Sequence, residues 1–260
     1  MSLRRSYPTK EHEKAAEVVA NYFSNIKEVE SVLLIGSCAR GKASPDSCLD
    51  MAVLVRPEES KVRIKDLEVA WNDFHDKEIA FKKLKEIGKY AFVEVEIIDG
   101  DFKPKMREWT SGPDDFELEI GNFLVYSVDL LSKGNYLEQL KAKWLPYYSE
   151  ELREKRLNEA RKYCINNLEH IPLYLERELY FQGFHRLYVS FREFLQALFI
   201  SKRVYPISYD KWIREQVEEV LGLPELYVRL PRLFEYKNFE SREIADRAKD
   251  LRVLLDKYAS

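Results

Sequence analysis

The stretch LLIGSCARGKASPDSCLDMAVLV, residues 33–55, contains two short apolar runs separated by a polar segment. The runs at 33–35 and 51–55 have the length and composition of buried strands. Gly36-Ser37 ends the first run, and a glycine lets the backbone turn sharply and approach a ligand closely. The stretch therefore predicts a strand, a glycine turn, a short helical or looped passage and a second strand.

The predicted turn is followed by groups that favour an anion. Backbone N–H groups at a turn that leads into a helix attract phosphate. Ser37 adds a hydroxyl donor, and Arg40 and Lys42 add positive charge within a few residues. Asp50 stands at the front of the second apolar run. The sequence thus predicts a phosphate-binding turn with a carboxylate on the adjacent strand.

This arrangement resembles the signature of the DNA-polymerase-β-like nucleotidyltransferase superfamily: Gly-Ser, then Ala-Arg-Gly, then Ser-Asp-x-Asp leading into a strand. Cys48 stands where the family has its first metal-binding aspartate. The resemblance implies transfer of a nucleoside monophosphate from an NTP, with ATP as the first candidate, to a small-molecule or protein hydroxyl. The residues to which it assigns nucleotide binding are Gly36, Ser37, Arg40, Lys42 and Ser47.

A third acidic position is expected on a later strand. Residues 91–98 read A-F-V-E-V-E-I-I, so Glu94 and Glu96 share one face of an extended strand. An exposed face of an edge strand would explain them equally well. The resembling family carries its third acid on such a strand, which favours Glu94 as metal ligand or general base, with Glu96 as the alternative.

The resemblance also implies divalent metal ions. Two ions about 3.5–4 Å apart clamp the reacting oxygens in such transfers. Asp50 is the intact ligand and Glu94 the second, whereas a cysteine at position 48 is a poor ligand for Mg²⁺. In an extended chain, Asp46 would lie about 13 Å from Asp50. That distance is too long for Asp46 to take the place of the missing ligand at position 48. We therefore expect weak binding of Mg²⁺ or Mn²⁺.

The chain organisation predicts an α+β protein in two domains. Residues 1–145 would form a small mixed-sheet nucleotidyltransferase-like domain, and residues 146–260 an all-α helical bundle. This layout is similar to antibiotic nucleotidyltransferases of the kanamycin and streptomycin type and to small prokaryotic relatives with a helical tail. In that family the acceptor lies in the cleft between the two domains, and we expect the same here.

Several local signals place helices. Thr9 predicts the N-cap of a first helix, and Ser149 that of the first bundle helix. Pro172 is predicted to separate that helix from the next. Residues 116–131 are ambiguous between helix and strand, and residues 134–146 read as a linker.

Composition narrows the class of protein. The 260 residues carry a net charge of −3, which argues against a broad nucleic-acid surface, since such surfaces are usually basic. No apolar run approaches the ~20 residues of a membrane span, and no export signal is visible. Three cysteines without metal-finger spacing fit reduced thiols in a cytoplasmic protein. A homodimer is compatible with the sequence.

Two alternatives to an active transferase remain open at this stage. One is a degenerate relative that binds a nucleotide and serves as a regulatory module, which differs from the enzyme by the ligand at Cys48. The other is a template-independent RNA-modifying transferase, and the acidic net charge counts against it.

Overall fold

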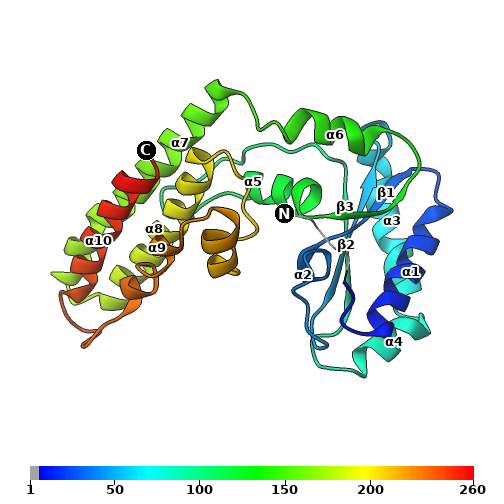
Figure 1. The fold of residues 1–260 in the computed structure, drawn as a ribbon, viewed down its shortest axis with the longest axis horizontal. Helices are drawn as coiled ribbons and strands as arrows, with labels where there is room; N and C mark the ends of the chain where they lie inside the picture. Colours follow the sequence, from blue (N-terminus) through cyan, green and yellow to red (C-terminus); the bar gives the residue numbers. More distant parts are fainter. Residues whose placement is uncertain (1–5) are drawn as a thin grey trace. The chain divides into compact units, whose positions relative to one another are not determined.

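A computed structural model describes residues 6–260, with the side chains of residues 58–63 excepted (Figure 1). The chain forms two compact units. The N-terminal unit comprises the residues up to Lys103 together with Glu119–Pro146, and the C-terminal unit comprises Pro104–Leu118 together with Tyr147–Ser260. The domains expected from the sequence, 1–145 and 146–260, are continuous segments. In the structure, residues 104–118 belong instead to the C-terminal unit.

A four-stranded mixed sheet forms the centre of the N-terminal unit. Its strands are β1 (Val29–Leu34), β2 (Leu49–Val55), β3 (Val93–Ile98) and β4 (Val128–Ser132), in the order β3-β2-β1-β4. β1 runs antiparallel to β2 and β4, and β2 runs parallel to β3. The predicted α+β class is confirmed. The first strand begins at Val29, four residues before the apolar run at 33–35, because Val29 already pairs with Val55.

Three helices cover one face of this sheet: α1 (Lys10–Ser24), α3 (Pro57–His75) and α4 (Ile79–Lys85). Thr9 caps α1 as predicted, because its hydroxyl accepts a hydrogen bond from the backbone N–H of His12. Alternate residues of the strands point into this core. The buried members from β2 are Leu49, Met51, Val53 and Val55.

The ambiguous region resolves into three short elements. It contains α5 (Phe116–Ile120), a π-helical turn at Gly121–Val125 and then β4. The linker predicted after β4 is wrong, since α6 (Tyr136–Trp144) occupies it. Gly134-Asn135 marks the beginning of this helix, with Asn135 at the N-cap position, and α6 buries Leu137, Leu140 and Trp144.

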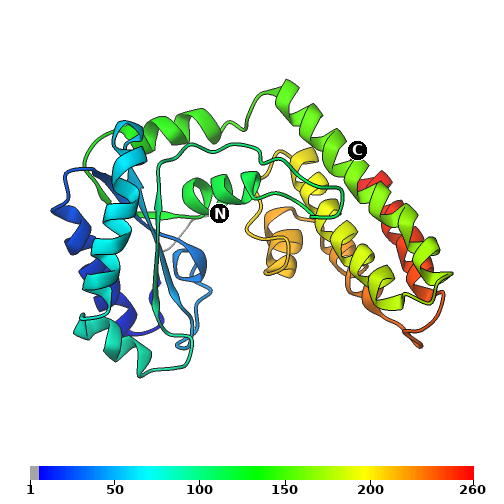
Figure 2. The same cartoon turned by 180° about the vertical axis from the view of Figure 1, so that it is seen from behind.

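The C-terminal unit is helical. Its long helices are α7 (Glu150–Leu175), α8 (Tyr180–Ser201) and α10 (Glu243–Tyr258), which pack against one another (Figure 2). The shorter ones are a π-helical segment at Glu215–Val220, α9 (Pro224–Tyr227) and a 3-10 turn at Pro231–Phe234. α8 is buried over most of its circumference, as expected for the most apolar helix of a bundle.

One helix boundary in this unit differs from the prediction. Ser149 caps α7 as expected by accepting from the N–H of Leu152. Pro172, however, lies inside α7 and does not end it. The helix continues to Leu175, and Glu178, with φ of 56°, turns the chain towards α8. A proline costs one hydrogen bond and a steric clash, and tertiary packing of α7 on α8 outweighs that local preference.

A buried polar network holds residues 104–118 in the C-terminal unit. Asp114 Oδ1 accepts from Arg156 Nη2 at 2.6 Å and from Gln196 Nε2 at 2.9 Å. Glu117 Oε2 accepts from the same two groups at 2.7 and 3.0 Å. All four side chains are buried, so their hydrogen bonds offset the cost of removing these charges from water.

Among the described residues, none of the helices combines the length and apolar character needed to cross a membrane.

Candidate functional site

The glycine turn and Asp50 are built around each other. Gly36 begins α2 (Gly36–Ala39) with φ of 65°, a left-handed conformation that favours glycine. A Cβ at this position would collide with Asp50 Oδ2 and lie 3.1 Å from Asp50 Cγ. The N–H of Ile35 donates to the carbonyl oxygen of Asp50 at 3.0 Å. The absence of a side chain at residue 36 therefore creates the space in which the Asp50 carboxylate lies.

Asp50 and Glu94 occupy paired positions on neighbouring strands. In the parallel register of β2 and β3, Asp50 pairs with Glu94 and Ala52 pairs with Glu96. Paired residues point to the same face, and adjacent strands lie about 4.8 Å apart. Asp50 is half-buried, and both glutamates are exposed. The sheet thus brings together Asp50 and Glu94, with Glu96 one pair further along.

Cys48 lies beside this pair. It precedes Asp50 by two residues and is half-buried. Burial, a hydrogen bond to Asp50 and the charges of Asp50 and Glu94 together raise the pKa of the Cys48 thiol to about 12. The group at this position is therefore a neutral thiol at pH 7, in contact with the one carboxylate of the motif that is intact.

Asp46 does not face this pair. Its Oδ1 accepts from the backbone N–H of Tyr90 at 3.0 Å and lies against Gly88. Asp46 therefore ties the loop before β2 to the turn before β3.

Arg40 supports the glycine turn from inside the fold. Only 6% of Arg40 is exposed, and its Nη1 donates to the carbonyl oxygen of Gly36 at 2.9 Å. Lys42 is exposed, and its backbone N–H donates to the carbonyl oxygen of Ser37 at 2.9 Å. The two basic residues thus lie in different environments. Arg40 is buried and stabilises the turn, whereas Lys42 lies at the surface.

Ser47 is held by its own loop and by α1. Its hydroxyl accepts from the N–H of Ser44 at 2.9 Å. The fully buried His12 lies with Nε2 2.9 Å from the carbonyl oxygen of Ser47 and Nδ1 2.8 Å from Thr9 Oγ1. Both ring nitrogens are therefore committed. The spacing of His12 from Thr9 at the helix start is the sequence signal that could have hinted at this link.

The donor set bears on which metal the site could hold. Among residues 6–57 and 64–260, whose side chains are described, no group of three or more His, Cys, Asp or Glu is arranged to bind a metal ion. Asp50 and Glu94 provide two carboxylates, and Mg²⁺ commonly binds through one or two carboxylates together with substrate phosphates. These residues fit one such ion completed by a triphosphate, and they do not supply the bridging carboxylates of a metal pair.

Comparisons with known proteins find a similarity over the segment that contains these residues. The family model described as polymerase beta, nucleotidyltransferase matches residues 17–101, which include Gly36, Asp50 and Glu94. No curated protein matches the chain. A solved structure of a nucleotidyltransferase-like protein from Exiguobacterium sibiricum 255-15 is similar, with 12% identity and a TM-score of 0.48 over 94% of this chain and 74% of that one. The segment 17–101, which is less than half of the chain, is thus similar to the polymerase beta nucleotidyltransferase family.

Proposed function

We propose that this protein transfers a nucleoside monophosphate from an NTP, with ATP as the first candidate, to a hydroxyl of a small molecule or a protein. The observation that carries the proposal is the pairing of Asp50 with Glu94 directly beside the left-handed turn at Gly36. This combination would set carboxylates beside the backbone N–H groups at the start of α2, which is what a triphosphate with a divalent ion requires.

The turn would bind the triphosphate. The backbone N–H groups that follow Gly36 and the hydroxyl of Ser37 would donate to phosphate oxygens. Lys42 would add positive charge from the surface. Arg40, because it is buried against the carbonyl oxygen of Gly36, would act as a positioning residue that fixes the turn. Ser47 would hold the loop in shape with the help of His12.

The carboxylates would serve the reaction in two ways. Asp50 and Glu94 would hold Mg²⁺ or Mn²⁺, which supplies charge neutralisation on the triphosphate when bound. The acceptor oxygen would form a bond to the α-phosphorus while the bond to pyrophosphate breaks. The proton of the acceptor hydroxyl would pass to Glu94, the exposed carboxylate that pairs with Asp50.

Pyrophosphate release tests this proposal. The full chain would be supplied with each NTP, with Mg²⁺ or Mn²⁺, and with pools of small-molecule and protein acceptors. We expect Glu94→Gln and Asp50→Asn each to reduce the rate by at least about 100-fold, because each removes transition-state charge stabilisation. Glu96→Gln is the matched control, since Glu96 lies on the same strand and face, opposite Ala52.

Two results would contradict the proposal. Equal losses of rate in Glu94→Gln and Glu96→Gln would show that the pairing of Glu94 with Asp50 does not contribute to the reaction. An absence of any NTP-dependent stabilisation would remove nucleotide binding altogether, since saturation at 100 times the Kd should stabilise the fold by about 2.7 kcal/mol.

A further inference from the structure

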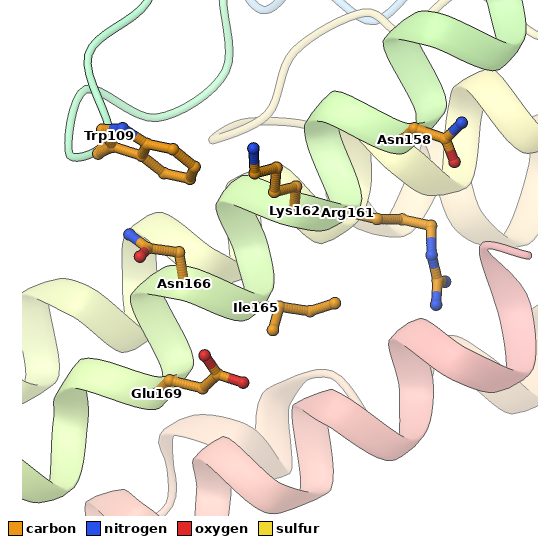
Figure 3. A pocket seen from close by; sticks show the side chains of 7 residues that line it. All are labelled: Trp109, Asn158, Arg161, Lys162, Ile165, Asn166 and Glu169. Carbon is orange, nitrogen blue, oxygen red and sulfur yellow. The ribbon is translucent and has the colours of Figure 1, made fainter.

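A pocket of about 420 Å³ lies within the C-terminal unit, along one face of α7 (Figure 3). Trp109 forms one wall from the 104–118 segment, and the other side chains come from successive turns of the helix. The volume falls in the range of small-ligand sites, about 300–1,000 Å³. No part of the proposed transferase site contributes to it.

The aromatic wall is fixed in place although it faces solvent. Trp109 is 46% exposed, yet its carbonyl oxygen accepts from Asn167 Nδ2 at 3.3 Å. Its ring packs on Tyr163 with centroids 4.8 Å apart. A large apolar ring held half-exposed by buried anchors is preorganised for contact with another molecule.

The anchors of Trp109 continue into the core. Arg107, two residues earlier, lies over the Tyr163 ring at 4.2 Å. Its Nη2 donates to Glu193 Oε1 at 2.9 Å, and Glu193 Oε2 in turn accepts from Asn167 Nδ2 at 3.0 Å. The tryptophan backbone is thus tied to α7 and α8 through one connected set of hydrogen bonds, and its ring packs on Tyr163, so the wall has little freedom to collapse.

The floor of the pocket carries polar groups that the fold does not use. Within the described part of the chain, the side chains of Asn158, Asn166 and Glu169 make no hydrogen bond, and the Lys162 ammonium contacts only the Trp109 ring, at 4.9 Å. Arg161 differs, since its guanidinium is occupied by Asp256 and by carbonyl oxygens near the C-terminus. Lys162 is therefore the cation available to a ligand.

We infer that this pocket binds a nucleoside monophosphate. A planar base would stack on the exposed face of Trp109, an interaction that tolerates any base. Lys162 would leave the indole ring, where an exposed cation–π contact is weak, and pair with the phosphate. The amides of Asn158 and Asn166 offer both donors and acceptors to base edges and ribose hydroxyls.

The charges on α7 orient this ligand. Glu169 lies seven residues beyond Lys162, about 10 Å along the helix axis. The phosphate is therefore expected at the Lys162 end, and the Glu169 carboxylate would accept from ribose hydroxyls or an exocyclic amine. The single uncommitted lysine and the net charge of −3 favour a free nucleotide over a nucleic-acid strand.

Calorimetric titration of the full chain with AMP, GMP, CMP and UMP, without divalent ions, tests the inference. We expect Trp109→Ala to weaken binding about 10- to 100-fold and Trp109→Phe to retain part of it. Trp212→Ala is the matched control, because Trp212 is 39% exposed in the same unit and does not line the pocket. Lys162→Ala should remove the advantage of each monophosphate over its nucleoside, whereas Lys155→Ala, on the same helix, should not.

The remaining arms separate this site from the proposed transferase site. Asp50→Asn and Ser37→Ala should leave monophosphate binding unchanged even if they abolish transfer, and failure of the transfer assay does not touch this result. Loss of binding in Asp50→Asn would overturn the inference, as would equal losses in Trp109→Ala and Trp212→Ala. Preferential binding of single-stranded oligonucleotides over monophosphates, or absence of binding at millimolar nucleotide, would also overturn it.

Discussion

The carboxylate of Asp50 occupies the space that any side chain at Gly36 would need. This contact lies between the turn after β1 and the beginning of β2. The backbone conformation of the turn and the position of the Asp50 carboxylate therefore depend on each other. A change at either residue is therefore expected to be felt at the other, which leads to the first prediction.

Gly36→Ala should destabilise the fold by about 2–4 kcal/mol, because it combines a left-handed backbone with overlap on Asp50. Gly222→Ala is the control, since Gly222 has φ of 67° and open space around it, and should cost only about 1–2 kcal/mol. Urea unfolding of both variants measures the difference. Addition of Asp50→Ala to Gly36→Ala should recover part of the loss, and equal costs in the two glycine variants would contradict the close approach.

Cys48→Asp should raise the affinity for Mg²⁺ in the presence of a non-hydrolysable NTP by at least about tenfold, or about 1.4 kcal/mol. The reason is that a neutral thiol is replaced by a hard, charged oxygen ligand next to Asp50. Calorimetric Mg²⁺ titration of the two proteins provides the measurement, and Asp50→Asn in the variant should abolish the gain. Unchanged affinity would mean that position 48 does not face the ion.

Arg156→Leu should destabilise the protein by about 3–5 kcal/mol, because it leaves Asp114 and Glu117 buried without their cation. Lys249→Ala removes an exposed pair with Asp246 and should change stability by less than about 1 kcal/mol. Chemical denaturation followed by circular dichroism compares them. A loss in Arg156→Leu no larger than in the control would show that the network contributes nothing to holding residues 104–118.

Glu193 should make stability depend on pH. Burial raises the pKa of this carboxyl to about 7, although Asn167, Arg107, Arg186 and Arg192 act to lower it. The folded state therefore holds a proton that the unfolded chain releases near pH 4.5. The stability that this group contributes is present below about pH 4.5 and is lost as the pH rises to about 7, by at most about 3 kcal/mol.

The slope of unfolding free energy between pH 5 and 7.5 measures this effect. Glu193→Gln should flatten the slope relative to the native protein, even if the amide lowers stability at every pH by mismatching its donors. Glu159→Gln, at an exposed position on α7, should leave the slope as it is. Identical slopes in all three proteins would indicate that Glu193 is ionised throughout this range.

The sequence predicts the motif well because its signals are local. Gly36 is required by a backbone conformation, and the apolar runs around it pair as neighbouring strands. The alternation that places Glu94 and Glu96 on one face follows from strand geometry alone. Their register with β2 does not, since it depends on pairing across 44 residues of intervening chain, so the sequence could not decide which glutamate lies opposite Asp50.

The predictions that failed depended on contacts between residues distant in sequence. Pro172 is an ordinary signal for a helix end, but packing of α7 keeps the helix intact through it. Gly134-Asn135 is an ordinary turn signal, and in the structure it marks the beginning of α6. Residues 99–115, with Gly100, Pro104, Gly112, Pro113 and several aspartates, are typical of loops. In the fold, Asp114 and Glu117 are buried against Arg156, and Arg107 is buried against Glu193. Partners so distant in sequence leave no periodic trace. The Trp109 pocket was missed for the same reason, because its two walls are separated in the chain.

Residues 104–118 belong to the C-terminal unit but are synthesised before the rest of it, and this order has a consequence for the nascent chain. Asp114 leaves the ribosome 42 residues before Arg156 and 82 residues before Gln196. At about 5–20 residues per second, the acidic pair waits roughly 2–8 seconds for its cation and longer for its amide. By the end of that interval β4 has been synthesised, so the N-terminal sheet has all its strands, while Asp114 and Glu117 still lack the Arg156 cation. In the nascent protein, the order of synthesis therefore places completion of the sheet before completion of this buried charge network.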